Sequence, residues 1–165
     1  MPRLSTIELF NERMKFAAGH FTILSSTKRE NLHGHNYQVH ACFTTIVEDE
    51  GMTFDYRFYK EKMLLICKSL NETTLVPGAS KYIRTEEHGN YCHVYFNDEK
   101  MIFAKRDITI LPITNVTVEE LSNYILNRLL QDSDELERNR MQKIKVKVFS
   151  APGQGGSTTW RKERE

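Results

Sequence analysis

The chain has 165 residues, of which 39% are hydrophobic and 27% charged, so we expect a single domain over residues 1–165 and exclude a disordered chain. Its 23 basic and 22 acidic residues leave a formal net charge of +1, which provides no strong overall field to attract nucleic acid or an anionic membrane. No apolar run approaches the roughly 18 residues of a membrane-spanning helix, and we expect a cytoplasmic protein.

The cysteines also favour a reducing compartment. Cys42, Cys67 and Cys92 are odd in number, lie far apart and form no Cys-x-x-Cys pair. A disulfide framework normally uses an even number of cysteines, and a thiolate zinc cluster uses closely spaced pairs. The sequence therefore indicates neither.

Two strands are predicted in the first third of the chain. Residues 9–24 and 36–47 are rich in residues that favour strands, and the polar run 25–31 between them is typical of an exposed loop. We expect the two strands to pair antiparallel. A turn at 48–51 and a short extended piece at 52–55 should follow.

Two helices and a further strand are predicted in the rest of the chain. Apolar side chains recur at helical spacing from residue 57, at Tyr59, Met63, Ile66 and Leu70. A second helix is expected from Thr117 to about Leu130, because Thr117 and Glu120 match a capping box. Residues 143–149 alternate apolar and lysine side chains, which predicts a strand with one buried face.

The stretch 77–115 between the predicted helices contains two apolar segments separated by Asn97-Asp98, a pattern typical of a hairpin. No linker, repeat or charge run divides the chain. The predicted fold class is therefore α+β, an antiparallel sheet with two helices on one face and an inserted hairpin.

The clearest chemical feature is the motif His33-Gly34-His35 at a strand start. Side chains at positions i and i+2 of a strand point to the same face, so both imidazoles can reach one metal ion. His20 on the preceding strand would be a third ligand if the two strands pair. Three histidines with one open position are typical of catalytic zinc. The alternative is that these are unrelated polar residues at a strand entrance.

The motifs Phe16-Ala-Ala-Gly-His20-Phe21 and His33-Gly-His35-Asn36-Tyr37 together resemble the paired zinc signature of the 6-pyruvoyl-tetrahydropterin synthase and 6-carboxytetrahydropterin synthase family. The segments Gly51-Met-Thr-Phe-Asp55-Tyr56 and Thr117-Val-Glu119 resemble the family as well. The resemblance covers most of the chain except the 77–115 insertion.

The resemblance implies a tunnelling fold with Zn²⁺ on His20, His33 and His35. It also implies a pterin substrate of the 7,8-dihydroneopterin triphosphate type. The assembly it implies is a homohexamer, a dimer of trimers with active sites at subunit interfaces.

The sequence departs from the family at the catalytic cysteine, since Arg29 stands four residues before His33. The next residue, Glu30, creates a Glu-x-x-His-Gly-His motif that resembles a variant subgroup whose members cleave the pterin side chain to give 6-hydroxymethyl-7,8-dihydropterin. A carboxylate beside the zinc site could take and return a proton. Alternatively, Glu30 is one more solvated residue in a charged loop.

A second departure concerns the family's Asp-His proton-transfer pair, in whose place Asn71 and Glu72 stand. Glu72 could still act as an acid or base, whereas Asn71 cannot. Ser150 occupies the place of the glutamate that binds the pterin's amino-pyrimidinone edge in the family, so pterin binding is weakened or Glu119 takes over.

Two further segments have both a structural and a binding interpretation. Thr117 matches the family's substrate-binding threonine, but it also suits a helix cap, which we favour. The glycine-rich segment 151–157 is either a phosphate-binding loop or a flexible turn.

Three functions are consistent with these residues. The first is a zinc-dependent lyase of reduced pterin metabolism, with Glu30 and Glu72 as candidate catalytic residues and Thr117, Glu119 and Ser150 as substrate-binding residues. The second is 6-carboxytetrahydropterin or 6-pyruvoyl-tetrahydropterin synthase activity, which the missing cysteine opposes. The third is a non-catalytic zinc-containing binding module on the same scaffold, and a family member with a changed substrate lies between these.

Overall fold

The computed structural model describes residues 1–163, which form a seven-stranded sheet, a separate three-stranded sheet and three α-helices. The large sheet has the strand order β10-β9-β3-β2-β4-β8, with β1 on the same side of β3 as β2 but farther along it. Its strands are β1 (Arg3–Leu9), β2 (Lys15–His20), β3 (His33–Val47), β4 (Thr73–Pro77), β8 (Ile108–Leu111), β9 (Met141–Ala151) and β10 (Gln154–Arg161).

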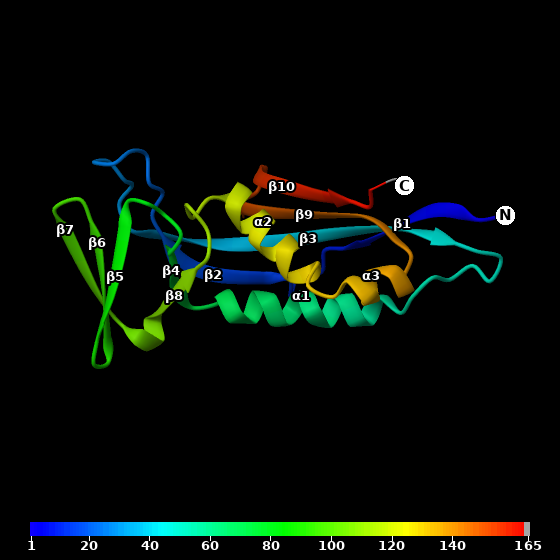
Figure 1. The fold of residues 1–165 in the computed structure, drawn as a ribbon, viewed down its shortest axis with the longest axis horizontal. Coiled ribbons are helices and arrows are strands. Elements are labelled where there is room, and N and C mark those ends of the chain that lie inside the picture. The colour runs from blue at the N-terminus through cyan, green and yellow to red at the C-terminus, as the bar shows by residue number, and fades with distance from the viewer. Residues whose placement is uncertain (164–165) are drawn as a thin grey trace.

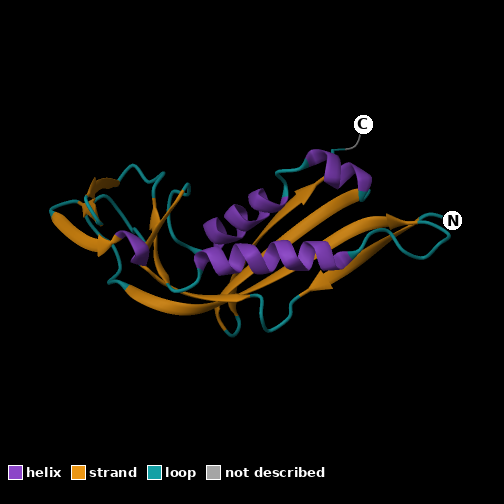
Figure 2. Ribbon diagram, turned by 90° about the horizontal axis from the view of Figure 1, so that it is seen from below, coloured by secondary structure: helices purple, strands orange, loops and turns teal. Residues whose placement is uncertain are grey.

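The long strand β3 organises the sheet, because β1, β2 and β9 all pair with it antiparallel. Its side chains alternate strictly in burial from Tyr37 to Val47, with the odd-numbered residues buried. Figure 2 shows the helices gathered on one face of this sheet. The predicted α+β architecture is confirmed, with the addition that β4 pairs parallel with β2 and with β8.

Both long helices start at a side-chain cap, of which only Thr117 was predicted from the sequence. Helix α1 (Tyr56–Leu70) begins at Asp55, which accepts a hydrogen bond from the Arg57 backbone, and α2 (Val118–Leu129) begins at Thr117, which accepts one from Glu120 N–H. Both bury the predicted apolar stripe against the sheet. A short third helix, α3 (Ser133–Arg138), was not predicted.

The inserted segment forms a three-stranded antiparallel sheet rather than a simple hairpin. Strands β6 (Tyr91–Phe96) and β7 (Glu99–Ala104) form the expected hairpin, and β5 (Ile83–His88) adds to its edge. A 3-10 turn at Lys105–Asp107 then leads into β8. Figure 1 shows this small sheet at one end of the molecule, opposite the end that carries both termini.

Two local predictions are wrong. Residues 9–24 form not one strand but the end of β1, a turn and β2. The glycine-rich segment 151–157 is neither a loop nor a flexible turn as a whole: Gly153 makes the turn with φ +77°, and Gly156 lies in β10. A Cβ on Gly156 would lie 3.0 Å from the Glu119 backbone nitrogen, so this glycine allows β10 to pack closely on α2.

Candidate metal centre

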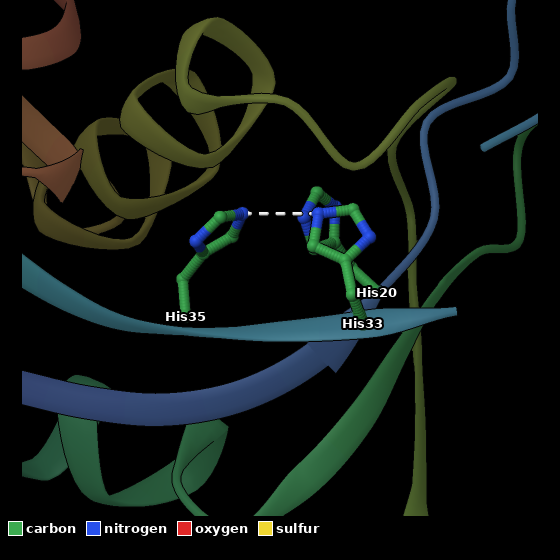
Figure 3. A group of neighbouring side chains, drawn as sticks. All are labelled: His20, His33 and His35. Carbon is green, nitrogen blue, oxygen red and sulfur yellow. Dashed lines mark hydrogen bonds between the residues drawn. The ribbon is translucent and has the colours of Figure 1, made fainter. Parts of the chain in front are cut away.

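The three histidines predicted as ligands converge at one end of the large sheet. Strands β2 and β3 pair so that His20 lies directly opposite His33, and His35 follows two residues later on the same face. One potential ligand atom from each of the three lies within 4.8 Å of the others. Figure 3 shows the imidazoles facing one another between the sheet and the segment that leads into α2.

Backbone carbonyls orient two of the three rings. His20 Nδ1 lies 2.9 Å from the Val116 carbonyl oxygen, and His33 Nδ1 lies 2.8 Å from the Asn31 carbonyl oxygen. A carbonyl oxygen only accepts, so each Nδ1 carries the hydrogen and each Nε2 keeps its lone pair. Metal-binding histidines are usually oriented in this way, by a hydrogen bond from the ring nitrogen that does not bind the metal.

The distances and burial fit a metal ion. The Nε2 atoms of His33 and His35 are 3.1 Å apart, close to the about 3.3 Å between two nitrogens of a tetrahedral zinc site. His20 is 5% exposed, and its Nε2 is buried without a hydrogen-bond partner. Burial lowers the pKa of His20, which favours the neutral ligand form. The residues present therefore suit Zn²⁺, with a fourth position for water or substrate.

Glu30 lies beside this cluster at the end of the loop that joins β2 to β3. Its Oε2 accepts a hydrogen bond of 3.2 Å from Thr22 N–H, and its own N–H donates to Thr22 O at 2.9 Å. The Thr22 hydrogen bond, with the nearby His33 and His20, lowers the pKa of the Glu30 carboxyl. Glu30 is half-buried and tied to the strand end that carries His20, so the solvated-residue interpretation does not describe it.

Glu72, the other predicted catalytic residue, is not part of the histidine cluster of its own chain. It lines a groove of about 480 Å³ together with Gly19, Gly34, His35, Asn36 and Asp107. Gly19, Gly34 and Asn36 alternate with the histidines along β2 and β3, so the part of the groove that they form lies on the sheet face opposite the imidazoles. Within one chain, the structure does not bring Glu72 to the histidine cluster.

The three predicted substrate-binding residues lie around the start of α2 and the end of β9. Thr117 is the helix cap, as favoured, and follows directly after the Val116 carbonyl that orients His20. Glu119 is exposed in the first turn of α2. Ser150 follows Phe149, which pairs with Gln38 of β3, and this places Ser150 beside Tyr37 on the face of the histidines.

Sequence reasoning missed Asn115. Its side-chain oxygen accepts from Ile23 N–H and Val116 N–H, both at 3.0 Å, and its amide donates to Ile23 O at 2.9 Å. Asn115 thus joins the loop between β2 and β3 (residues 21–32, called here the Glu30 loop) to the segment that orients His20. Asn115 lies two residues before the helix cap Thr117, and nothing in the local sequence predicts its role, because its partner Ile23 is 92 residues away.

Comparison with known proteins places the chain in a family. The model of the family described as 6-pyruvoyl tetrahydropterin synthase matches residues 10–159. A protein of Pyrococcus abyssi is 27% identical over 139 residues, 84% of this chain and 81% of its own length. The name it bears, 6-carboxy-5,6,7,8-tetrahydropterin synthase, is provisional.

Two solved structures show the same fold along nearly the whole chain. The 6-pyruvoyl tetrahydropterin synthase of Plasmodium falciparum superposes with a TM-score of 0.89 and 28% identity, covering 96% of this chain and 98% of its own. A Plasmodium vivax 6-pyruvoyltetrahydropterin synthase, solved as a variant with a catalytic glutamate replaced by cysteine, gives a TM-score of 0.90 and 26% identity, with coverages of 96% and 99%. The small inserted sheet therefore lies within the region of similarity.

Over residues 1–163, no helix combines the length and apolar character needed to cross a membrane.

Proposed function

Because the chain belongs to the 6-pyruvoyl tetrahydropterin synthase family of pterin-metabolism enzymes, we propose that it is a zinc-dependent lyase acting on 7,8-dihydroneopterin triphosphate or a related reduced pterin. The product we propose is 6-hydroxymethyl-7,8-dihydropterin, formed by cleavage of the side chain. The observation that carries this proposal is the position of Glu30 next to three convergent histidines.

The histidines and Glu30 have separate roles in the proposed reaction. His20, His33 and His35 hold the zinc ion, which when bound supplies a Lewis acid that polarises oxygens of the substrate side chain. Glu30 is ionised at neutral pH and accepts the proton of the C2′ hydroxyl as the C1′–C2′ bond of the side chain breaks, which releases a two-carbon aldehyde that carries the triphosphate. It then returns the proton to C1′ of the pterin product. That a glutamate is the named catalytic residue in the Plasmodium vivax structure supports this assignment.

The alternative pterin activities, 6-carboxytetrahydropterin and 6-pyruvoyl-tetrahydropterin synthesis, are favoured by the printed names of the relatives. They are opposed by the lack of a thiol at the site. Cys67 is buried in α1, Cys92 is buried in the inserted sheet, and Cys42 lies on the sheet face opposite the histidines. Cleavage by a carboxylate therefore suits the chain better.

A non-catalytic zinc-binding module is favoured by Ser150, because a hydroxyl cannot accept the paired hydrogen bonds that a carboxylate receives from a pterin edge. In our proposal Glu119 provides that carboxylate, and Thr117 and Ser150 bind the same pterin. Glu119 is exposed and free of hydrogen bonds from its side chain within the described residues, so it is available for a ligand.

We also propose a cytoplasmic homohexamer, a dimer of trimers, with neither nucleic acid nor membrane as a partner. The position of Glu72 supports the assembly. Its groove includes Gly19, Gly34 and Asn36, which alternate with the histidines along the strands, so in our proposal Glu72 serves the metal centre of a neighbouring subunit.

The decisive experiment is incubation of the zinc-loaded protein with 7,8-dihydroneopterin triphosphate and identification of each pterin product by mass spectrometry, with a metal-stripped control. Zinc-dependent formation of 6-hydroxymethyl-7,8-dihydropterin is expected. A pyruvoyl or carboxy product would instead support the alternative activities, and no zinc-dependent product would leave a changed substrate or a binding role.

The matched variant is Glu30→Gln, which keeps the size of the side chain and an oxygen for Thr22 but removes the basic carboxylate. We expect unchanged zinc content and a turnover lower by about 10²- to 10⁴-fold. Full turnover in this variant, or loss of zinc together with activity, would contradict the role of Glu30 as acid or base.

A further inference from the structure

Arg29 connects three parts of the molecule around the metal centre. Its Nε donates to Glu99 Oε2 at 2.7 Å, and a second guanidinium nitrogen completes the ion pair with the same carboxylate. Its third nitrogen donates to the Glu30 backbone oxygen at 2.8 Å. The guanidinium also lies over the ring of Phe21, 5.0 Å from its centre. One side chain therefore contacts the residue after a metal ligand, the backbone of Glu30 and the inserted sheet.

The inserted sheet supports this contact with an apolar cluster. Phe21 and Ile23, on the segment that enters the Glu30 loop, are buried against Phe96 of β6, with Ile83 and Met101 at the edge. Phe96 pairs with Glu99 at the turn of the β6–β7 hairpin, so the apolar contact and the ion pair lie at the same end of the hairpin. The Glu30 loop is thus held from outside the large sheet.

The ion pair is not an ordinary surface pair. The Arg29 side chain is only 16% exposed, although that of Glu99 is 53% exposed. A fork of planar donors that binds a carboxylate and a carbonyl together fixes direction as well as distance, which the point charge of a lysine does not. In the loop between β2 and β3, residues 25–28 are all polar and exposed.

We propose that Arg29 is a positioning residue for the Glu30 carboxylate and that the inserted β5–β7 sheet is the support against which it acts, through Glu99. This inference rests on the proposed function of Glu30. Within residues 1–163, the side-chain contacts of Arg29 are with Glu99, the Glu30 backbone and Phe21, and none is a hydrogen bond to a histidine. Its effect is on the geometry of proton transfer, for which a misplacement of about 1 Å reduces rate by on the order of 100-fold.

The test starts from Arg29→Met, which keeps an apolar stem over Phe21 without the guanidinium. It compares this variant with Glu99→Gln, with Arg29→Glu and with the charge-exchanged double variant Arg29→Glu/Glu99→Arg. Each is measured for zinc content, kcat, KM and amide hydrogen exchange over residues 21–32. The matched control is Glu87→Gln, which removes the 2.6 Å ion pair with Lys105 within the same inserted region but away from the loop.

We expect Arg29→Met to keep one zinc per chain, to lower kcat on the order of 100-fold with KM changed less than threefold, and to speed exchange over 21–32. Glu99→Gln should show the same pattern to a smaller extent, because the guanidinium keeps its bond to Glu30 O. Glu87→Gln should match the wild type. The double variant Arg29→Glu/Glu99→Arg should show slower amide hydrogen exchange over residues 21–32 than Arg29→Glu alone.

Loss of zinc in parallel with kcat would overturn the proposal, because Arg29 would then support the metal centre as a whole. Unchanged exchange and kcat in Arg29→Met would overturn it too. If the wild type itself forms no pterin product, the proposed function fails, and hydrogen exchange still decides whether Arg29 and Glu99 fix the loop. In that case, equal amide hydrogen exchange over residues 21–32 in the wild type, Arg29→Met and Glu99→Gln refutes the inference independently of the proposed function.

Discussion

Replacing Asn115 by alanine should weaken both the fold and the metal centre. The change removes three hydrogen bonds, two with the backbone of Ile23 and one with Val116 N–H. Ile23 is 8% exposed, so its N–H and C=O lose their partners with little access to water. An unsatisfied buried polar group costs about 1–3 kcal/mol, so the two Ile23 groups together give a loss of about 2–6 kcal/mol in the free energy of unfolding.

The same substitution frees the segment whose Val116 carbonyl orients His20. Loss of a group that hydrogen-bonds to a metal-binding histidine typically lowers metal affinity by about 10- to 100-fold. We expect a decrease near the lower end, because the Val116 carbonyl itself remains. Thermal unfolding of the metal-free protein should show a midpoint lower by about 5–15 °C at equal protein concentration. Competition with a chromophoric chelator measures the zinc affinity.

Two further variants sharpen this prediction. Asn115→Asp keeps the acceptor for Ile23 and Val116 N–H but loses the donor to Ile23 O, and it should fall between wild type and alanine. Asn127→Ala, on the exposed side of α2, should lie within about 0.5 kcal/mol of wild type. A stability of Asn115→Ala equal to that of Asn127→Ala would refute the reasoning.

Other consequences can be measured on the same protein. His33→Ala should lose stoichiometric zinc while its far-ultraviolet circular dichroism stays the same, and retained zinc would reject the three-histidine site. Gly156→Ala should lower the free energy of unfolding by about 1–3 kcal/mol, since the added Cβ meets the backbone of α2, and an unchanged denaturant midpoint would contradict that contact. Burial raises the pKa of the Cys67 thiol to about 12, so iodoacetamide at pH 8 should alkylate the half-buried Cys42 well before Cys67, and equal labelling by peptide mass spectrometry would contradict the packing.

Local patterns were enough to predict the two long helices and the convergence of His33 and His35. The stripe from Tyr59 to Leu70 and the cap at Thr117 act within a few residues, and the i, i+2 spacing of His33 and His35 places both on one strand face whatever the sheet does. His20 needed one further assumption, the antiparallel pairing of two neighbouring strands, which the structure confirms.

Features that depend on distant partners were not predictable in this way. The glycines at 155 and 156 indicate a loop when considered alone, and only their packing against β9 and α2 makes them part of a strand. The parallel pairing of β4 with β2 and β8 joins segments that are separated by an inserted sheet. The same pairing places Glu72 on the outer face, away from the metal centre of its own chain.

The amino-acid sequence by itself determined the chemistry available to this protein: three imidazoles at metal-binding spacing, a carboxylate at Glu30 and no cysteine beside them. Tertiary structure alone decided how those groups are held. Val116 reaches His20 from 96 residues away, and Glu99 reaches Arg29 from 70 residues away. Ligand identity follows from residue type and short-range geometry, whereas orientation follows from contacts whose formation requires the whole sheet to be assembled.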